Sequence, residues 1–375
     1  MSGFVKLYVI IQLCALIAVS CGQGRRAGSV DNPRPADGIA GSADRNAAAG
    51  KFTKNTTRPV IGFSIATATF IVERWNKDLK VFSGAAQELG ADVIVQLSAG
   101  GIKEQIAQIN YMVNQKIDLL VVVAHDTEAI AGAIKQVRDA GIPVIAYDRM
   151  IMGTPVDAYI SFDSRDVGRA YGRALQAAVP KGRYLVVNGS LHDFNSFEIS
   201  GGLHEILDPY IEAGDIVIGK EIWLEEWSSD EALEKIGPIF DEDFDWDAIA
   251  CGNDAIANAA IQLLSERRRA GEVAVVGQDA GLINCQRIVE GIQLMTVYKP
   301  IGKLAPRAAR LALAIIRKED CPPDLMLENG SGVPVPSYIE ESIAVFKDNI
   351  DVVIRDGFHS KEDVYRNTGF RNDNN

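Results

Sequence analysis

Residues 143–152 read PVIAYDRMIM, and the interpretation of the whole chain starts from this stretch. Residues 143–147 are apolar throughout, which is typical of a strand buried on both faces of a parallel sheet. Asp148 and Arg149 follow directly. A charged pair at the end of a buried strand either belongs to a solvated loop or forms part of a polar binding site for a ligand. The residues that follow the other strands decide between these alternatives.

Short apolar runs alternate with amphipathic segments on both sides of this stretch. Up to residue 162, the expected strands are 59–66, 91–97, 118–124, 143–147 and 158–162. In residues 79–89, apolar side chains recur at spacings of three and four, which predicts a helix with one buried face. Strands that are apolar on both faces and alternate with helices predict a parallel sheet covered on both sides.

The same pattern begins again in the second half of the chain. The expected strands there are 183–189, 215–223, 246–252, 273–278 and 293–299, with helices that include 255–268 and 301–318. Two successive sets of strands and helices predict an α/β protein of two similar lobes. Each lobe offers the carboxyl ends of its strands to a ligand, so the cleft between facing lobes is the expected site.

Polar side chains follow strand after strand in this arrangement. They are Asp148 and Arg149; His192, Asp193 and Asn195; Asn253 and Asp254; Gln278 and Asp279; Lys299; and, after the first strand, Glu73 and Arg74, which precede Trp75. Singly, Asp254 and Asp279 could be helix N-caps and Arg149 a solvated loop residue. Together, the acids, amides and cations suit a ligand rich in hydroxyls, because carboxylates accept hydrogen bonds while Arg, Lys and amide groups donate them.

Aromatic side chains near the same strand ends suit the apolar faces of a sugar ring. The candidates are Phe70, Trp75, Phe194 and Trp227. For Trp227, which follows a strand and precedes a helix start, the alternative is packing in a core or between domains.

Composition excludes several classes of function. A net charge of −12 argues against a general affinity for nucleic acid or for an anionic membrane surface. The sequence has no GxSxG, Walker, GxGxxG or HExxH motif, and its four histidines are scattered, so we expect no catalytic residue, metal or cofactor. Cys251, Cys285 and Cys321 are odd in number and widely spaced, which is typical of buried apolar side chains rather than a disulfide framework.

The N-terminus differs from the rest of the chain. Residues 4–20 are an apolar run, and residues 18–21 read AVSC, which resembles the lipobox of bacterial lipoproteins, with Cys21 as the lipidated residue. A soluble secreted protein and a retained membrane anchor are the alternatives. Residues 22–57 are rich in Gly, Ala, Asn and Asp without an apolar period, and we expect a flexible tether.

Several segments are similar, in the same order, to the signature segments of one family. They are VERWNKD (72–78), VIAYDRMI (144–151), YISFDSRDVG (159–168), GNDAIA (252–257), GQDA (277–280), TVYKPI (296–301) and the tail KDNIDVVIRDGFHSKEDVY (347–365). This set resembles the periplasmic D-xylose-binding proteins, which are substrate-binding components of sugar ABC transporters. Two features depart from the family: a longer first loop, and Phe194 where the family has one of two paired asparagines.

The resemblance implies two Rossmann-like lobes with parallel sheets, the fold of type I periplasmic binding proteins, joined by three hinge crossings. The N-terminal lobe would comprise 58–162 and 299–335, and the C-terminal lobe 163–298 and 336–365, before a tail at 366–375. A pyranose would lie in the cleft. The implied contacts to its hydroxyls are Arg74, Asp148, Arg149, Asn195, Asn253, Asp279 and Lys299, with Trp75 and Trp227 flanking the ring.

We therefore expect a monomeric, non-enzymatic binding protein, tethered by lipid in the periplasm or at the cell surface. Its expected ligand is a monosaccharide, with D-xylose the first choice and ribose, arabinose or glucose the alternatives. It would deliver the sugar to an ABC permease in the cytoplasmic membrane, or present it to a sensor histidine kinase. A LacI-type repressor needs a basic N-terminal helix-turn-helix, and an enzyme acting on sugars needs an acid–base pair. Neither is identifiable in the sequence.

Overall fold

The computed structural model describes residues 58–66, 73–243 and 245–368. These residues all belong to one unit, Phe52–Asn375. The predictions for the signal peptide, Cys21, the tether at 22–57, the lengthened loop with Phe70, and residues 369–375 of the tail fall outside the described residues. In the described part of the chain, no helix has the length and hydrophobicity needed to cross a membrane.

The first lobe is built on a seven-stranded sheet whose strand order is β11-β12-β5-β4-β3-β1-β2. All of its pairings are parallel except that of β11 with β12. The strands are β1 (Val60–Ala66), β2 (Asp92–Ser98), β3 (Leu119–Val123), β4 (Val144–Tyr147), β5 (Ala158–Phe162), β11 (Leu325–Leu327) and β12 (Val335–Glu340). The helices of this lobe are α1 (Glu73–Glu88), α2 (Ile102–Asn114), α3 (Ala131–Asp139) and α9 (Ile301–Arg317).

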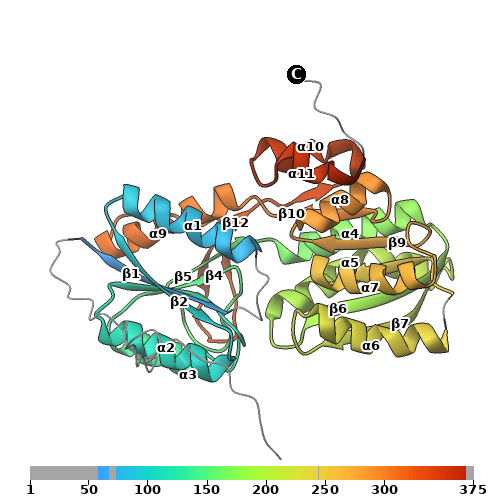
Figure 1. The fold of residues 1–375 in the computed structure, drawn as a ribbon. Helices are drawn as coiled ribbons and strands as arrows, with labels where there is room; N and C mark the ends of the chain where they lie inside the picture. Colours follow the sequence, from blue (N-terminus) through green and yellow to red (C-terminus); the bar gives the residue numbers. More distant parts are fainter. Residues whose placement is uncertain (1–57, 67–72, 244, 369–375) are drawn as a thin grey trace, which may run out of the picture. The chain divides into compact units, whose positions relative to one another are not determined.

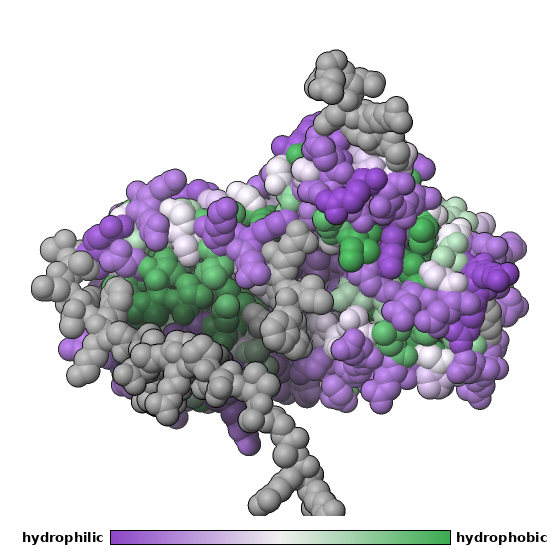
Figure 2. All heavy atoms as spheres, in the orientation of Figure 1, coloured by the Kyte–Doolittle hydropathy of each residue, from purple (hydrophilic) through white to green (hydrophobic). Residues whose placement is uncertain are grey.

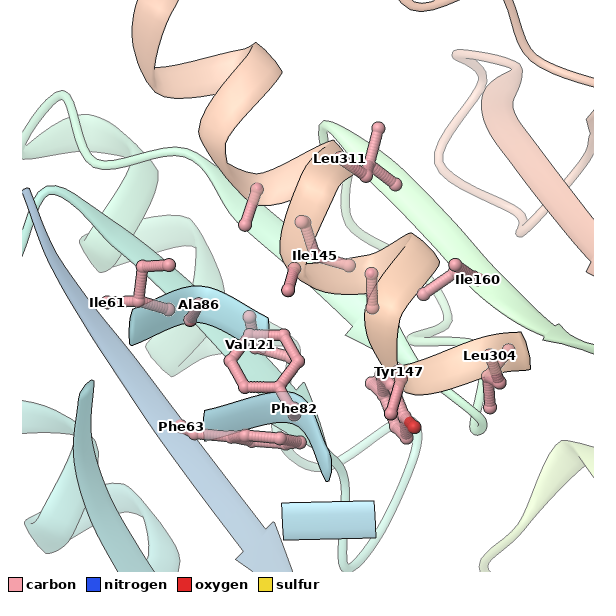
Figure 3. Packing of buried hydrophobic residues seen from close by; sticks show 14 of the residues in the cluster. Ile61, Phe63, Phe82, Ala86, Val121, Ile145, Tyr147, Ile160, Leu304 and Leu311 are labelled. Carbon is pink, nitrogen blue, oxygen red and sulfur yellow. The ribbon is translucent and has the colours of Figure 1, made fainter. Parts of the chain in front are cut away.

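Both faces of this sheet are buried, as the apolar runs predict. Alternate strand residues such as Phe63 and Val121 pack under α1 and α9, while Leu120 and Val122 pack under α2 and α3. Figure 3 shows the first of these layers, in which the rings of Phe63, Phe82 and Tyr147 meet below α9. Side chains that point to opposite faces along one strand explain why the whole run must be apolar.

The second lobe repeats this layering around a six-stranded sheet of order β13-β10-β9-β8-β6-β7, in which only β13 is antiparallel. Its strands are β6 (Gly182–Ser190), β7 (Ile216–Leu224), β8 (Ala248–Cys251), β9 (Ala274–Gln278), β10 (Met295–Tyr298) and β13 (Ile343–Val345). Its helices are α4 (Ser164–Ala178), α5 (Phe194–Glu212), α6 (Ser229–Glu242), α7 (Asp254–Glu266), α8 (Leu282–Glu290), α10 (Asp351–Arg355) and α11 (Lys361–Val364). All ten predicted strands are confirmed.

The chain passes between the lobes three times: between β5 and α4, between β10 and α9, and between β12 and β13. The third passage differs from the prediction, which placed the boundary at residue 335. Strand β12 pairs in parallel with β5, with Ser337 opposite Tyr159, and therefore belongs to the first lobe. Val335 and Tyr338 are buried in the cores of that lobe, which keeps the strand there until Glu340.

Figure 2 shows hydrophilic residues over much of the described surface on one face, together with an area of hydrophobic residues over the first lobe.

In the second lobe, α4 and α5 approach each other very closely. A Cβ added at Gly168 would lie 1.9 Å from the carbonyl oxygen of Ile199, and one added at Gly202 would lie 1.9 Å from that of Arg165. Only glycine on each helix permits this contact between backbones.

Gly168→Ala should therefore lower the free energy of unfolding by about 3 kcal/mol, because the two helices must separate to admit one methyl group. Urea titration followed by circular dichroism measures the change. Gly84→Ala in α1 is the matched control, since no atom lies within 4 Å of the added Cβ, and it should be neutral or stabilising by up to about 1 kcal/mol. Equal losses in the two variants would contradict the close approach.

Helix α5 is also tied to β7 through a histidine. The ring of His204 lies 3.0 Å from the Asp208 carboxylate and 3.2 Å from the Glu221 carboxylate. Hydrogen bonding to Glu221 raises the pKa of His204 to about 9, despite partial burial. A ring held between two carboxylates donates from both nitrogens, so the charged form is the one that fits this position.

The His204 contacts should stabilise the fold fully below the unfolded pKa of about 6.5, and this stabilisation should disappear as the pH rises through about 9. Urea titrations of the wild type and of His204→Gln between about pH 6 and pH 10 test the sign. The wild type should be the more stable protein at the acid end, and the difference should shrink toward the alkaline end. A constant difference across this range would show that the ring does not titrate between the carboxylates.

Candidate functional site

The polar pair that ends β4 is held in a fixed, unusual conformation. Asp148 has a φ of 64°, a left-handed conformation that costs energy for any residue with a side chain. Its carbonyl oxygen accepts hydrogen bonds from Ser161 Oγ at 2.7 Å and from Tyr159 Oη at 3.2 Å. The neighbouring strand β5 thus pins the turn that presents the Asp148 carboxylate at the carboxyl edge of the sheet.

Arg74 reaches the same edge from the first turn of α1. It is buried, and it is paired with Asp148 of the first lobe and, at 3.3 Å, with Asp279 of the second lobe. Its Nε lies 3.6 Å from Asp78, one helical turn further along α1. Burial raises the pKa of Asp78 to about 6, and the hydroxyl of Tyr147 donates to its carboxylate. The Arg74 guanidinium therefore joins two carboxylates of its own lobe to one of the other lobe.

In the second lobe, the turns after β8 and β9 present further polar groups. Asn253 caps α7 by accepting a hydrogen bond from Ile256 N at 2.9 Å, so Asn253 fills the capping role considered for Asp254. Asp254 instead turns inward, where Gly281 N and Thr296 Oγ1 each donate to it at 2.9 Å. Burial raises the pKa of Asp254 to about 8, against these donors. Asp279 follows β9 with a φ of 95°.

Arg74, Asp148, Asn253, Asp254 and Asp279 all line one cavity of about 210 Å³ between the lobes. Each of the nine residues singled out from the sequence lines it: Arg74, Trp75, Asp148, Arg149, Asn195, Trp227, Asn253, Asp279 and Lys299. The convergence expected for the strand ends is therefore present. That these side chains bind a ligand remains a prediction.

The cavity has further lining residues that the nine do not include, among them His125, Asp193, Glu226, Asp254, Asn258, Gln278, Asn284 and Phe358. Asp193, Asp254 and Gln278 stand at strand ends, where the sequence pattern already pointed. Phe358 comes from the segment after the third crossing, and no strand or helix period indicates it. The carbonyl oxygen of Phe358 accepts a hydrogen bond from Lys77 Nζ at 2.5 Å, and the same Nζ lies 3.8 Å from the centroid of the Phe358 ring.

Two tryptophans form part of the cavity wall. Trp75 is almost fully buried in the first-lobe core, with the Arg74 guanidinium 4.5 Å from its ring centroid. Trp227 donates from Nε1 to Asp193 at 3.0 Å. Its ring lies against the backbone of β6, because a Cβ at Gly189 would come within 2.2 Å of it. Phe194, considered as a third aromatic wall, does not line the cavity and packs against the first-lobe core instead.

The charges in the cavity are paired with one another. Arg149 lies 2.8 Å from Asp193 across the lobes, and Lys299 lies 3.7 Å from Asp279. Burial alone would raise the pKa of Asp148, but Arg74 and Lys299 outweigh it and hold that pKa below its ordinary value. Burial raises the pKa of Asp193, and Arg149 opposes the rise. Every cation among the described lining residues already faces a carboxylate, so the site does not suit an anionic ligand.

Some hydrogen-bonding capacity in the cavity is unused. Within the described residues, Lys299 Nζ and Asn253 Nδ2 donate no hydrogen bond, and Gln278 Oε1 is buried without a donor. Buried polar groups are normally satisfied, so Gln278 Oε1 calls for a donor from a ligand or water, while Lys299 Nζ and Asn253 Nδ2 can each donate to one. No group of His, Cys, Asp and Glu side chains in the described part could hold a metal ion.

The sequence and the fold of this chain are similar to those of known proteins. The chain matches the model of the periplasmic binding protein domain over residues 34–320, more than half of its length. The chain belongs to the periplasmic binding protein family. This periplasmic binding protein is 40% identical over 296 residues to a D-xylose-binding periplasmic protein of Haemophilus influenzae, covering 78% of this chain and 89% of the relative. It is 39% identical over 295 residues to the protein of the same name in Escherichia coli, with the same coverage.

Solved structures give the same result for the fold. A carbohydrate transporter solute-binding protein of Chloroflexus aurantiacus, in complex with D-glucose, has a TM-score of 0.76 and 26% identity, covering 82% of this chain and 98% of that one. The predicted two-lobed α/β fold and the predicted family are thereby confirmed. The relatives are named as binding proteins, which fits the expectation of a non-enzyme.

The position of Trp227 depends on Gly189, so Gly189→Ala should push the ring away from the cavity wall and break its bond to Asp193. We expect a shift in tryptophan emission, measured in the wild-type and Trp227→Phe backgrounds. The shift should vanish when Trp227 is absent. A shift of equal size in both backgrounds would mean that Gly189 acts on another part of the fold.

Proposed function

We propose that this periplasmic binding protein binds a monosaccharide, D-xylose first among the candidates, in the cavity between its lobes and delivers it to an ABC importer. The observation that carries the proposal is the cavity itself. It gathers donors and acceptors from both lobes around a volume of about 210 Å³. Drug-sized ligands occupy pockets of about 300–1,000 Å³, so the space suits a single small ring rather than an oligosaccharide.

The chemistry of the lining matches the hydroxyls of such a ring. A hydroxyl donates one hydrogen bond and accepts up to two, so it can satisfy a carboxylate and a cation together. Asp148 and Asp279 would accept from hydroxyls, while Arg149, Lys299 and the amides of Asn195 and Asn253 would donate. The rings of Trp75 and Trp227 would face the C–H surfaces of the sugar.

D-xylose is preferred because of the relatives. Both D-xylose-binding proteins are about 40% identical to this chain over most of its length, whereas the D-glucose complex shares 26% identity. Ribose, arabinose and glucose are the other candidates. A site that hydrogen-bonds a given hydroxyl strongly rejects analogues that lack it, and an added group is rejected by lack of space.

Delivery would depend on a change between open and closed forms. A sugar held by both lobes favours the closed form in proportion to its greater affinity for that form. The three crossings between the lobes are the positions where the chain can bend. An ABC permease in the cytoplasmic membrane, or a sensor kinase, would then recognise the closed form. Lipidation of Cys21 would keep the protein at the membrane surface.

A thermal-shift screen tests the choice of sugar. D-xylose should raise the melting temperature more than ribose, arabinose, glucose or galactose at equal concentration, because the ligand stabilises only the folded protein. A rise confined to a hexose would reject the pentose assignment and leave the sugar-binding function in place. No rise with any sugar would reject the function.

Arg149→Ala should weaken D-xylose binding by over ~2 kcal/mol, or about thirtyfold, because a charged hydrogen bond is lost and the buried Asp193 loses its partner. Isothermal titration calorimetry measures the loss. Arg173→Ala on α4, whose side chain is 54% exposed, is the matched control and should bind as the wild type does. Equal affinity of Arg149→Ala and the wild type would remove Arg149 from the site.

A further inference from the structure

Four consecutive residues of the second lobe, 192–195, each contact the first lobe. The carbonyl oxygen of His192 accepts from Thr127 N at 2.9 Å. Asp193 pairs with Arg149 at 2.8 Å, and Asn195 Nδ2 donates to the carbonyl oxygen of Asp148 at 3.0 Å. Phe194 packs against the first-lobe core that lies between the sheet and helices α2 and α3. We call residues 192–195 the latch segment.

The latch segment has two kinds of residue. Asp193 and Asn195 line the cavity, so a ligand would contact them directly. His192 and Phe194 do not line it. Their side chains contact the first lobe outside the cavity, which means that they can affect closure without touching a ligand.

The two contacts outside the cavity differ in strength. The His192 ring lies 3.3 Å from Asp126 of the first lobe and 3.3 Å from Glu225 of its own lobe, but its side chain is 43% exposed. Exposed ion pairs are screened by water and salt and contribute little. Phe194, which is partly buried, instead removes part of an aromatic ring and part of an apolar core from water. The apolar contact is therefore the main one.

The Phe194 contact exists only while the lobes are together. Phe194 is the first residue of α5 in the second lobe, whereas the buried cluster that it packs against is built from first-lobe residues, among them Met150, Ile151 and Tyr159. Separation of the lobes would return both apolar surfaces to water. The contact therefore adds stability to the closed form alone.

We propose that Phe194 is a positioning residue that sets the balance between the open and closed forms, and thereby the rate at which ligand is released. The proposal rests on the proposed sugar-binding function only in its choice of ligand for the rate measurement. A ligand with a fixed affinity for the closed form binds less tightly overall when that form is less populated. Loss of the Phe194 ring should thus weaken binding of every sugar that the cavity accepts by the same factor.

Stopped-flow fluorescence with D-xylose measures the rates in Phe194→Ala, Phe194→Leu and Phe197→Ala. Phe194→Ala should release the sugar about tenfold faster, with little change in the association rate, because the lost contact forms as the lobes close. Phe194→Leu keeps part of the apolar surface and should recover part of the loss. Phe197 is the matched control: it lies on the same helix, is 45% exposed and stacks on Trp223 of its own lobe at 4.8 Å. Phe197→Ala should behave as the wild type.

Small-angle X-ray scattering of the same variants, with and without sugar, separates this proposal from the proposed function. Phe194→Ala should have a larger radius of gyration than Phe197→Ala in at least one of the two conditions, with thermal melts confirming that both variants are folded. If the wild type binds no sugar, the function is rejected and the ligand-free scattering still tests the latch. Identical release rates and identical scattering for the Phe194 and Phe197 variants would overturn the proposal.

Discussion

The arrangement of the cavity depends on the guanidinium of Arg74. It is buried and holds carboxylates from both lobes, Asp148 on one side and Asp279 on the other. A buried charge is costly unless it is paired. Removing one member of such a group leaves the other charges unpaired in a protein interior that solvates them poorly. This cation therefore fixes where the acceptors of both lobes lie. The positive φ angles of Asp148 and Asp279 show that the backbone bears strain at the same two points.

The pairing also limits which ligands the cavity can accept. With each cation opposite a carboxylate, an anionic solute would add an unbalanced negative charge to a largely buried space. A polyol adds none, and its hydroxyls can insert between the paired charges without replacing them. Discrimination among sugars would then come from where hydroxyls fall relative to single groups such as Asn253 Nδ2 and Lys299 Nζ.

Much of this architecture is readable from the sequence, for two physical reasons. Strands buried on both faces are largely apolar, so their ends are sharply marked where charged residues begin, as at Tyr147 and Asp148. Parallel strands place those ends on one edge, so Arg149, Asn195 and Asp279 could be assigned to a common site before any coordinates. Two results were not accessible this way. Strand β12 joins the first lobe through pairing distant in sequence, and Asn253 takes the capping role that either it or Asp254 could have filled.

Phe358 has a consequence for the use of the protein outside its natural setting. It lies beyond the last strand of both sheets, in the segment that carries α10 and α11, yet it forms part of the cavity wall. Next to it, the His359 ring is hydrogen-bonded to the carbonyl oxygen of Ala280, and this contact ties the segment to the turn that carries Asp279. A shortened version that ended after β13 would keep every described strand while opening one side of the cavity. Biosensors built on this scaffold should accordingly carry their reporter group after residue 368 rather than in place of the C-terminal helices.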